Sequence, residues 1–262
     1  MVDHKQQKKS FNSIMNQEIL NDQVKPYNEH ENKTAQLARL FNKISKRYDS
    51  FNDLISWGMA HSWRRKSVSY LKEFAPQNIL DIATGTADML LTACDLLQPK
   101  TITGIDISEE MMKIGERKVQ KKHPATKVSF ELQDASALNF QDNSFDAVTI
   151  SFGIRNLEML SKSLQEINRV LKPQGHFLIV EVNQPQKGII LVLYKIYLRI
   201  YQLFSSKLLD KSDFQYLTTS MGVFPRGKQL ISLLGEFNFE LVRYKRFTFD
   251  VCSAYLLRKT TV

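Results

Sequence analysis

Glycine is scarce in this chain, with ten residues in 262. Only Gly85 is a glycine in the turn at residues 83–87, so the G-x-G-x-x-G fingerprint of dinucleotide-binding proteins is absent there. Cysteine and histidine are also rare: two cysteines do not make a disulfide framework, and five histidines show no ligand spacing. We therefore expect no diphosphate ligand, no disulfide scaffold and no metal site.

Long apolar runs and dense basic runs are missing as well. Residues 1–9 are polar and do not resemble a signal peptide, and the most apolar stretch, residues 188–204, carries Lys195 and Arg199 and is short for a membrane span. The net charge of +9 is spread along the chain, with no basic run denser than residues 118–122. We expect a cytoplasmic protein that does not bind nucleic acid, with an anionic membrane surface left open as a partner.

The stretch at residues 78–89 carries the strongest local pattern. Apolar residues typical of a buried strand run into a turn of small residues, and apolar residues at helical spacings of three and four follow. Ligands bind at the carboxyl ends of strands in open α/β sheets. The alternative interpretation is an ordinary strand-to-helix turn without a ligand.

Acidic residues further along favour a ligand. Asp106 ends a second predicted strand, where a carboxylate accepts hydrogen bonds from ribose hydroxyls. Asp134 and Ala135 follow a third strand, where an adenine edge would lie. Asp88, at the start of the helix after the turn, disfavours a pyrophosphate and suits a cationic ligand. S-adenosylmethionine, with its ribose, adenine, ammonium and sulfonium groups, fits this set.

Strand and helix patterns alternate through the middle of the chain. Helices separate five predicted strands, near residues 78–82, 101–106, 127–133, 145–151 and 176–182. A closing hairpin follows at residues 239–247 and 249–257. This order predicts an α/β fold with a doubly wound, mostly parallel, seven-stranded Rossmann-like sheet and a C-terminal antiparallel hairpin.

The chain is expected to form one domain, residues 33–262, behind a poorly ordered arm at residues 1–32 that is rich in Gln, Asn and Lys. Residues 33–73 begin with an amphipathic helix and continue through an aromatic, amide-rich segment into a second helix. This part either covers the ligand site as a lid or packs on the sheet as an ordinary helix-turn-helix.

An insertion at residues 188–221 opens with the apolar stretch 188–204. We expect a helix that buries one face and offers aromatic side chains to a lipophilic ligand or a membrane surface. The side chains concerned are those of Tyr194, Tyr197, Tyr201 and Phe204. The alternative is an ordinary core helix.

Several stretches together are typical of one family. They are Tyr48-Asp-Ser-Phe-Asn-Asp-Leu-Ile-Ser56 with Trp63 seven residues beyond, Phe152-Gly-Ile-Arg-Asn156, Arg169-Val-Leu-Lys-Pro-Gln-Gly175 running on to Glu181, and Phe224-Pro225. On these residues the chain resembles the ubiquinone/menaquinone biosynthesis C-methyltransferases, class I enzymes that use S-adenosylmethionine. The similarity runs from about residue 33 to residue 259.

The resemblance implies cofactor contacts and an acceptor. The implied cofactor contacts are Thr86, Asp106, Asp134, Ala135 and Ser151, to which we add Asp81 and Gly85 of the strand and turn. The implied acceptor is a polyprenyl quinol, which resides in a membrane. A peripheral contact at the inner face of the membrane is therefore expected, and an oligomeric state stays open.

The same resemblance implies methyl transfer to a ring carbon, which needs a deprotonated ring hydroxyl and a stabilised oxygen anion. Arg155 is the candidate to stabilise that anion or orient a water, and Asn156 would assist. Tyr48 and Asp49 would hold the ring from the lid, with Asp49 a conceivable base. The alternative for Arg155 is a structural ion pair.

The chain departs from the family pattern at several positions. Ala87 and Gln174 each stand in place of a glycine, and Asn183 stands in place of a serine. Ala60 takes the place of a histidine, with His61 next to it. We expect Ala87 to add only a methyl group and to tighten the turn without abolishing binding.

Quinol C-methylation, from demethylmenaquinol to menaquinol, is the favoured function. The alternatives are a methyltransferase for another small lipid or phenol and a non-enzymatic scaffold that binds quinone or lipid. The sequence does not separate a naphthoquinol ring from a benzoquinol ring.

Overall fold

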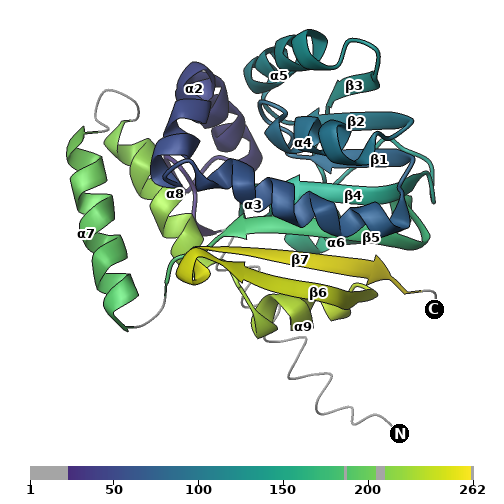
Figure 1. Cartoon of the computed structure of the whole chain (residues 1–262). Coiled ribbons are helices and arrows are strands. Elements are labelled where there is room, and N and C mark those ends of the chain that lie inside the picture. Colours follow the sequence, from purple (N-terminus) through teal and green to yellow (C-terminus); the bar gives the residue numbers. More distant parts are fainter. Residues whose placement is uncertain (1–22, 186–187, 205–209, 261–262) are drawn as a thin grey trace, which may run out of the picture.

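The computed structural model describes residues 23–185, 188–204 and 210–260. Its strands form one sheet of seven in the order β3-β2-β1-β4-β5-β7-β6 (Figure 1). The strands are β1 (Asn78–Ile82), β2 (Thr101–Asp106), β3 (Lys127–Leu132), β4 (Phe145–Ser151), β5 (Leu171–Val182), β6 (Phe239–Phe247) and β7 (Cys252–Lys259).

Strands β1 to β5 pair in parallel, whereas β7 pairs antiparallel with both β5 and β6. In this register Ile82 lies beside Ile105 and Ile150, so the carboxyl ends of three strands meet at one edge. The predicted doubly wound sheet with its C-terminal hairpin is confirmed. The last strand begins at Cys252 because residues 248–250 form a 3-10 turn, η4 (Thr248–Asp250).

Helices cover both faces of the sheet because neighbouring strand residues point to opposite sides. The covering helices are α3 (Met59–Val68), α4 (Asp88–Leu97), α5 (Glu109–Lys122), α6 (Leu160–Val170) and α9 (Lys228–Gly235). Leu80 and Ile82 pack in one buried cluster with α6 and α9. Ile79 packs on the opposite face with α3 and α4. The alternation of strand residues therefore fixes which helix lies on which face.

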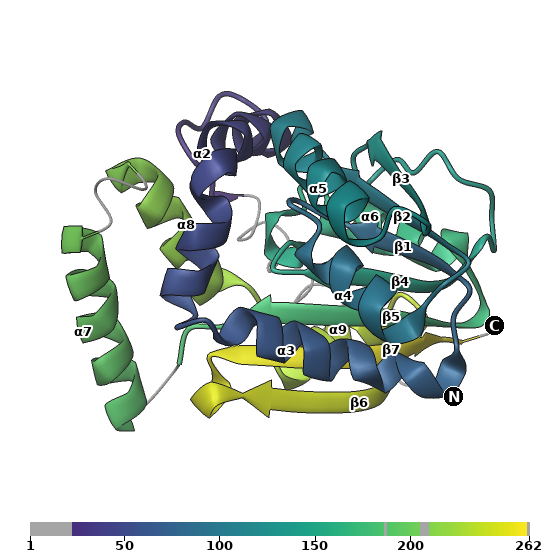
Figure 2. The same ribbon diagram turned by 45° about the horizontal axis from the view of Figure 1, so that its top comes forward.

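Three further helices lie beyond the carboxyl ends of the parallel strands (Figures 1 and 2): α2 (Lys33–Ile55), α7 (Gly188–Phe204) and α8 (Lys211–Val223). Helices α2 and α8 share a third buried cluster, in which Leu37, Leu40 and Phe51 meet Phe214 and Leu217. Helix α7 lies outermost, next to α8. The three helices close the edge at which the strand ends meet.

The segment at residues 48–58 joins a helix over the strand ends to a helix on the sheet. Helix α2 continues without a break to Ile55, so Tyr48 lies on a helix that covers the edge. Helix α3 begins after Gly58, whose φ of 69° needs a residue that tolerates the left-handed region, and it packs Trp63 on the sheet. Helix α2 thus takes the position of a lid and α3 that of an ordinary packed helix.

Residues 23–32, the described end of the predicted arm, pack against the helices. The Gln36 side chain accepts hydrogen bonds from the backbone N–H groups of Tyr27 (2.7 Å) and Asn28 (3.0 Å). The Tyr27 hydroxyl donates to Asp213 on α8 (3.0 Å). The predicted boundary at residue 32 therefore falls inside packed structure, while residues 1–22 lie outside the described residues.

Of the two outcomes predicted for the α7 tyrosines, contact with a membrane surface is wrong for the two that are described, and contact with a lipophilic ligand stays a prediction. The Tyr194 side chain is buried, and the Tyr197 hydroxyl donates to the Leu54 carbonyl (2.6 Å) with its ring against Trp57. The side chains of Tyr201 and Phe204 lie outside the described residues. A helix that is apolar nearly all round has no polar face to fix its orientation in sequence.

Aliphatic side chains form the exposed face of α7 instead. They are Ile189, Val192, Leu193 and Ile196, with exposed fractions of 67%, 51%, 55% and 47%. Within the described ranges, none of the helices is both long and apolar enough to cross a membrane.

Candidate functional site

The turn after β1 passes close to the end of β4. Gly85 (φ 53°) and Ala87 (φ 66°) both adopt the left-handed region that favours glycine. A Cβ atom on Gly153 would lie only 2.6 Å from that of Ala83, so glycine is needed at this approach. The expectation that Ala87 merely tightens the turn needs correction: its cost lies in backbone conformation, roughly 1–2 kcal/mol for a residue with a side chain.

Asp106 ends β2 directly beside this turn. Its Oδ2 accepts a hydrogen bond from the Gly85 N–H and its Oδ1 from the Ser108 N–H, both at 2.8 Å. Burial raises the pKa of Asp106 to about 6, although these backbone donors act to lower it. A carboxylate has about four lone-pair positions, so two fixed donors leave capacity for a pair of hydroxyl groups.

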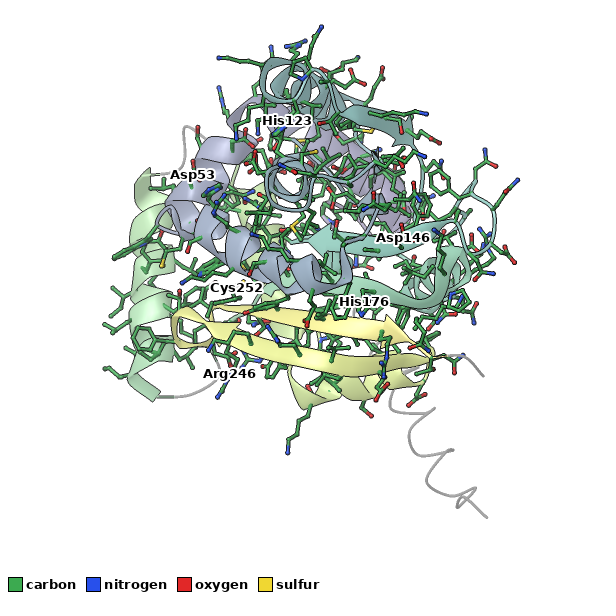
Figure 3. All side chains as sticks on the ribbon, turned by 45° about the vertical axis from the view of Figure 1, so that its right-hand side comes forward. Asp53, His123, Asp146, His176, Arg246 and Cys252 are labelled. Carbon is green, nitrogen blue, oxygen red and sulfur yellow. The ribbon has the colours of Figure 1, made fainter. Side chains whose placement is uncertain are left out.

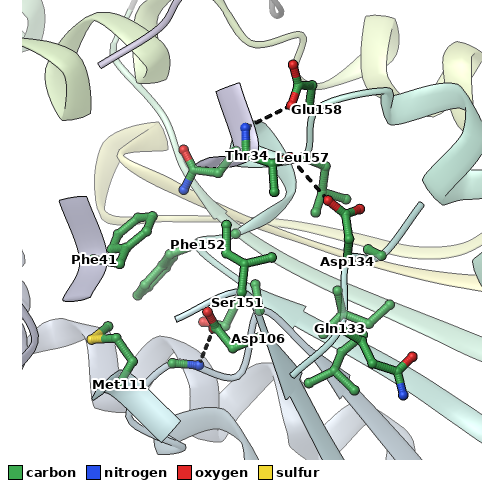
Figure 4. A pocket seen from close by; sticks show the side chains of 18 of the residues that line it. Thr34, Phe41, Asp106, Met111, Gln133, Asp134, Ser151, Phe152, Leu157 and Glu158 are labelled. Atoms are coloured by element: carbon green, nitrogen blue, oxygen red, sulfur yellow. Dashed lines mark hydrogen bonds between the residues drawn. The ribbon is translucent and has the colours of Figure 1, made fainter. Parts of the chain in front are cut away.

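The first turn of α2 reaches over the end of β3 (Figure 4). The Thr34 hydroxyl donates to Oδ2 of Asp134 (3.1 Å), and the Ser136 N–H donates to Oδ1 (2.7 Å). The backbone N–H groups of Lys33 and Thr34 donate to the two carboxylate oxygens of Glu158, at 2.9 and 2.8 Å. An acid at a helix N-terminus is stabilising, so these contacts fix the first turn of α2 over the end of β3.

A pocket, here called the strand-end cavity, lies where β1, β2, β3 and β4 end (Figure 4). It is lined by five of the predicted cofactor residues: Gly85, Asp106, Asp134, Ala135 and Ser151. Two of the catalytic candidates, Tyr48 and Asn156, also line it. The buried carboxylate of Asp106 next to apolar walls fits a nucleoside that carries ribose hydroxyls.

Asp81 and Thr86 do not line the strand-end cavity. Asp81 is fully buried and accepts hydrogen bonds from the Thr149 (2.6 Å) and Thr84 (2.7 Å) hydroxyls. Burial raises the pKa of Asp81 to about 6. The Thr86 hydroxyl donates to Asp49. Both residues shape the turn, and their direct contact with a cofactor stays a prediction.

An ion-pair network joins the lid helix to the start of α4. Lys118 Nζ lies 2.6 Å from Asp49 and 2.8 Å from Asp88, and Arg64 contacts Asp88 (3.1 Å) and donates to the Ser151 hydroxyl (3.2 Å). Burial acts to raise the pKa of Asp88, but the charges of Arg64 and Lys118 hold it below its ordinary value. The sequence interpretation of Asp88 as the partner of a cationic ligand needs correction, because two cations of the protein already balance it.

Arg155 is held by a buried ion pair. Its Nη1 donates to the Glu181 carboxylate and to the Phe152 carbonyl (2.7 Å), and its Nε lies 3.4 Å from the Ser220 hydroxyl. Burial raises the pKa of Glu181, which Arg155 opposes. The structural ion pair foreseen as the alternative is present. A catalytic part for Arg155 stays a prediction, as does one for Asn156, whose Oδ1 accepts from the Tyr216 hydroxyl (2.9 Å).

A second pocket, here called the aromatic cavity, lies between α2, α7 and α8. Its polar members are Asn52, Ser56 and Arg155. Most of its wall is apolar, including Phe51, Trp63, Phe152, Tyr194, Leu217 and Met221. The apolar and aromatic side chains of this wall suit an apolar ring.

Phe152 borders both cavities. Its φ of 59° is unusual for a bulky side chain, and such strain persists only where surrounding contacts enforce it. Those contacts are a hydrogen bond from its N–H to the Val180 carbonyl (2.8 Å), the Arg155 guanidinium on its carbonyl, and the Arg64 guanidinium 4.9 Å above its ring. A ligand in either cavity would therefore lie against the same ring.

Three residues of the site had no role assigned from sequence. Asn52 lies within the family stretch at residues 48–56, and Glu158 follows the stretch at residues 152–156. Their position in or next to these stretches was the sequence signal that could have pointed to them. No sequence signal pointed to Lys118, because its partners Asp49 and Asp88 lie in segments far from it along the chain. Asp49, predicted as a conceivable base, lines neither cavity.

Comparisons with known proteins agree with this geometry. The ubiE/COQ5 methyltransferase family matches residues 29–259. A demethylmenaquinone methyltransferase of Bacteroides fragilis is 40% identical over 240 residues, covering 91% of this chain and 98% of that protein. The enzyme of the same name from Thermus thermophilus is 36% identical over 219 residues, 83% of this chain and 98% of that one.

Solved structures show the same fold. A crystal structure of a SAM-dependent methyltransferase from Aquifex aeolicus superposes with a TM-score of 0.52 at 19% identity, covering 72% of this chain and 87% of that one. The predicted class I methyltransferase fold is confirmed by this likeness. At such low identity the likeness concerns the fold alone.

Proposed function

Because the chain belongs to the ubiE/COQ5 methyltransferase family, we propose that it transfers a methyl group from S-adenosylmethionine to a ring carbon of demethylmenaquinol, giving menaquinol. The observation that carries this proposal is the pair of adjoining cavities, one lined by carboxylates and one by aromatic side chains, with Phe152 on the border of both. The names of the two relatives compared above favour a naphthoquinol over a benzoquinol acceptor.

The residues of the strand-end cavity would hold the cofactor. Asp106 would accept hydrogen bonds from the ribose hydroxyls, with Asp134 and Ala135 at the adenine end and Gly85 and Ser151 near the reacting end. When bound, S-adenosylmethionine supplies an electrophilic methyl carbon: the new carbon–carbon bond takes its electron pair from the ring, the carbon–sulfur bond breaks onto sulfur, and the ring carbon loses a proton.

The aromatic cavity would hold the acceptor ring. Its apolar walls exclude water, which strengthens any hydrogen bond or charge that acts on the ring oxygens. Arg155 lines this cavity and is fixed by Glu181, so its guanidinium is preorganised to favour a ring oxygen that becomes negative. Positioning two bound reactants against one wall would supply much of the rate.

Two predicted lid residues take different parts in this proposal. Burial raises the pKa of Tyr48, with Asn52 and Arg155 acting in the opposite direction, so its hydroxyl stays protonated at neutral pH and acts as a donor. Asp49 lines neither cavity and is occupied by Lys118 and Thr86. It therefore positions Thr86 rather than serving as the base.

The proposal includes reversible contact with the inner face of an anionic membrane, where a polyprenyl quinol resides. The exposed aliphatic face of α7 would enter the interface, and the exposed Lys195 and Arg199 would meet anionic head groups. Tyr194, on the inner side of the same helix, lines the aromatic cavity. One helix would thus connect the bilayer surface to the ring site.

The direct test is methyl transfer in vitro. Purified protein, radiolabelled S-adenosylmethionine and a short-tailed demethylmenaquinol kept reduced by dithionite should give labelled menaquinol. The oxidised quinone should give none, because only the quinol ring can become an electron-rich phenolate. Labelling of an unrelated phenol but not of the quinol would redirect the proposal to another acceptor.

A further inference from the structure

The polar groups of the aromatic cavity differ in how well the protein satisfies them. The Ser56 hydroxyl contacts the Asp53 carbonyl (3.4 Å) and accepts from the Ala60 N–H (3.2 Å). The Arg155 guanidinium has Glu181 as its partner. The protein therefore already supplies partners to the Ser56 hydroxyl and fixes the position of the Arg155 guanidinium.

Asn52 is the exception. Its side-chain Nδ2 is buried and has no hydrogen-bond partner, and the residue is 8% exposed. Across the part of the chain that the structure describes, the one other buried side-chain nitrogen or oxygen in this condition is His176 Nε2. A buried donor without a partner costs free energy, so each such group in a folded protein calls for an explanation.

Tyr48 does not supply the missing partner. The Asn52 amide opposes the rise that burial causes in the pKa of Tyr48, yet no hydrogen bond of normal geometry satisfies Nδ2. Tyr48 lines the strand-end cavity and Asn52 the aromatic cavity, one turn apart on α2. The two side chains therefore lie at the border where the two reactants would meet.

We propose that Asn52 binds the acceptor, its Nδ2 donating a hydrogen bond to the ring oxygen next to the carbon that is methylated. This inference rests on the proposed function and assigns the ring-oxygen donor within that site. A neutral amide stabilises an oxygen more strongly as negative charge develops on it, and the apolar wall removes water as a competitor. Asn52 would therefore favour the deprotonated ring that attacks the methyl carbon.

Asn52→Leu tests the proposal because it removes the amide while keeping the size of the side chain. We expect kcat with a short-tailed demethylmenaquinol to fall about 10- to 100-fold, with a smaller change in KM. The kcat–pH profile should move to higher pH, since the bound ring hydroxyl loses the donor that favours its ionisation. The affinity for S-adenosylmethionine and the unfolding temperature should not fall, because Nδ2 has no partner to lose.

A binding measurement avoids dependence on turnover. With S-adenosylhomocysteine present, wild-type protein should bind 1-naphthol more tightly than naphthalene, and Asn52→Leu should remove that preference. His176→Leu is the matched control because it removes the other unpartnered buried side-chain nitrogen. His176 lies beside Phe74 and lines neither of the two cavities (Figure 3). That variant should keep the naphthol preference, kcat and the pH profile.

The outcomes separate the two claims. Wild-type methylation of the quinol with unchanged kcat, pH profile and naphthol preference in Asn52→Leu would overturn the role of Asn52 and leave the proposed function standing. Naphthol preference lost in the variant, but no quinol methylation by the wild type, would support Asn52 as a phenol ligand and remove the proposed function. A fall in unfolding temperature that matches the activity loss would make Asn52 a structural residue.

Discussion

Arg155 and Glu181 form an ion pair inside the core, where their exposed fractions are only 6% and 1%. The same guanidinium nitrogen donates to the Phe152 carbonyl, so the pair also fixes the backbone of the residue that borders both cavities. Removing one partner of such a pair leaves an uncompensated buried charge, at a cost of about 3–5 kcal/mol. The Arg155–Glu181 pair therefore contributes both to the stability of the fold and to the position of Phe152.

Arg155→Lys keeps the positive charge and loses the planar fork. We expect kcat to fall about 100-fold while the dissociation constant for S-adenosylmethionine changes little. Glu181→Gln provides the stability reference, with an expected loss of about 3 kcal/mol in urea unfolding. If Arg155→Lys loses stability to the same degree, or if cofactor binding collapses, Arg155 holds the fold rather than the acceptor.

Cofactor binding should weaken in acid. Because burial raises the pKa of Asp106 to about 6, its carboxylate is fully ionised only above about pH 7 and loses acceptor capacity below pH 6. Calorimetry should give a dissociation constant at pH 5 roughly tenfold higher than at pH 7.5.

Two variants separate the possible origins of that pH dependence. Asp106→Asn should bind weakly and with little dependence on pH in this range. Asp81 has a pKa raised to about 6 as well but lies outside the strand-end cavity, so Asp81→Asn should keep the wild-type dependence in a folded protein. The reverse pattern would mean that the ribose is not held at Asp106.

The aliphatic face of α7 predicts how the protein meets lipid. Replacing Ile189 and Leu193 with serine should abolish sedimentation with anionic vesicles and raise KM for a long-tailed quinol far more than for a short-tailed one. Each basic residue near an anionic surface contributes about 1 kcal/mol to the free energy of membrane binding. Added salt screens this attraction, so it should weaken the binding of the wild-type protein to vesicles. Val242→Ser, at an exposed apolar position on β6, is the control and should change neither measurement.

Gln174→Gly should stabilise the fold. Gln174 is exposed and has φ 62°, so glycine relieves roughly 1 kcal/mol of backbone strain without losing packing. Ala87→Gly should change the free energy of unfolding little. Glycine relieves the same kind of backbone strain there, but the substitution removes a fully buried methyl group, whose burial contributes about 0.8 kcal/mol. Chemical unfolding of both variants tests this, and equal gains would mean that the Ala87 methyl contributes nothing.

The sequence was informative where local pattern and tertiary position coincide. Asp106 ends a strand of clear alternation, and parallel pairing then brings that strand end to the turn that carries Gly85. Both residues could be assigned to one site because the carboxyl ends of parallel strands share an edge. The same logic located Asp134, whereas Ser151 was implied by the family resemblance and lies at the end of β4.

The sequence was uninformative where a partner comes from a distant segment. The link between Lys118 and Asp49 depends on how α5 packs against α2, and no local pattern encodes that packing. The orientation of α7 could not be predicted for a different reason. Its own residues are apolar on nearly every side, so periodicity could not show whether Tyr194 or Leu193 faces outward. Both the Lys118–Asp49 ion pair and the orientation of α7 depend on tertiary contacts.

Helix α2 contributes Thr34, Phe41 and Tyr48 to one cavity and Phe51 and Asn52 to the other. A single helix thus forms part of two binding sites, and each ligand contacts that helix. We expect the first reactant that binds to restrict the remaining motion of α2, so that the second binds more tightly than it would alone. We therefore expect positive cooperativity between donor and acceptor, and thermodynamic reciprocity requires the enhancement to be equal in both orders of addition.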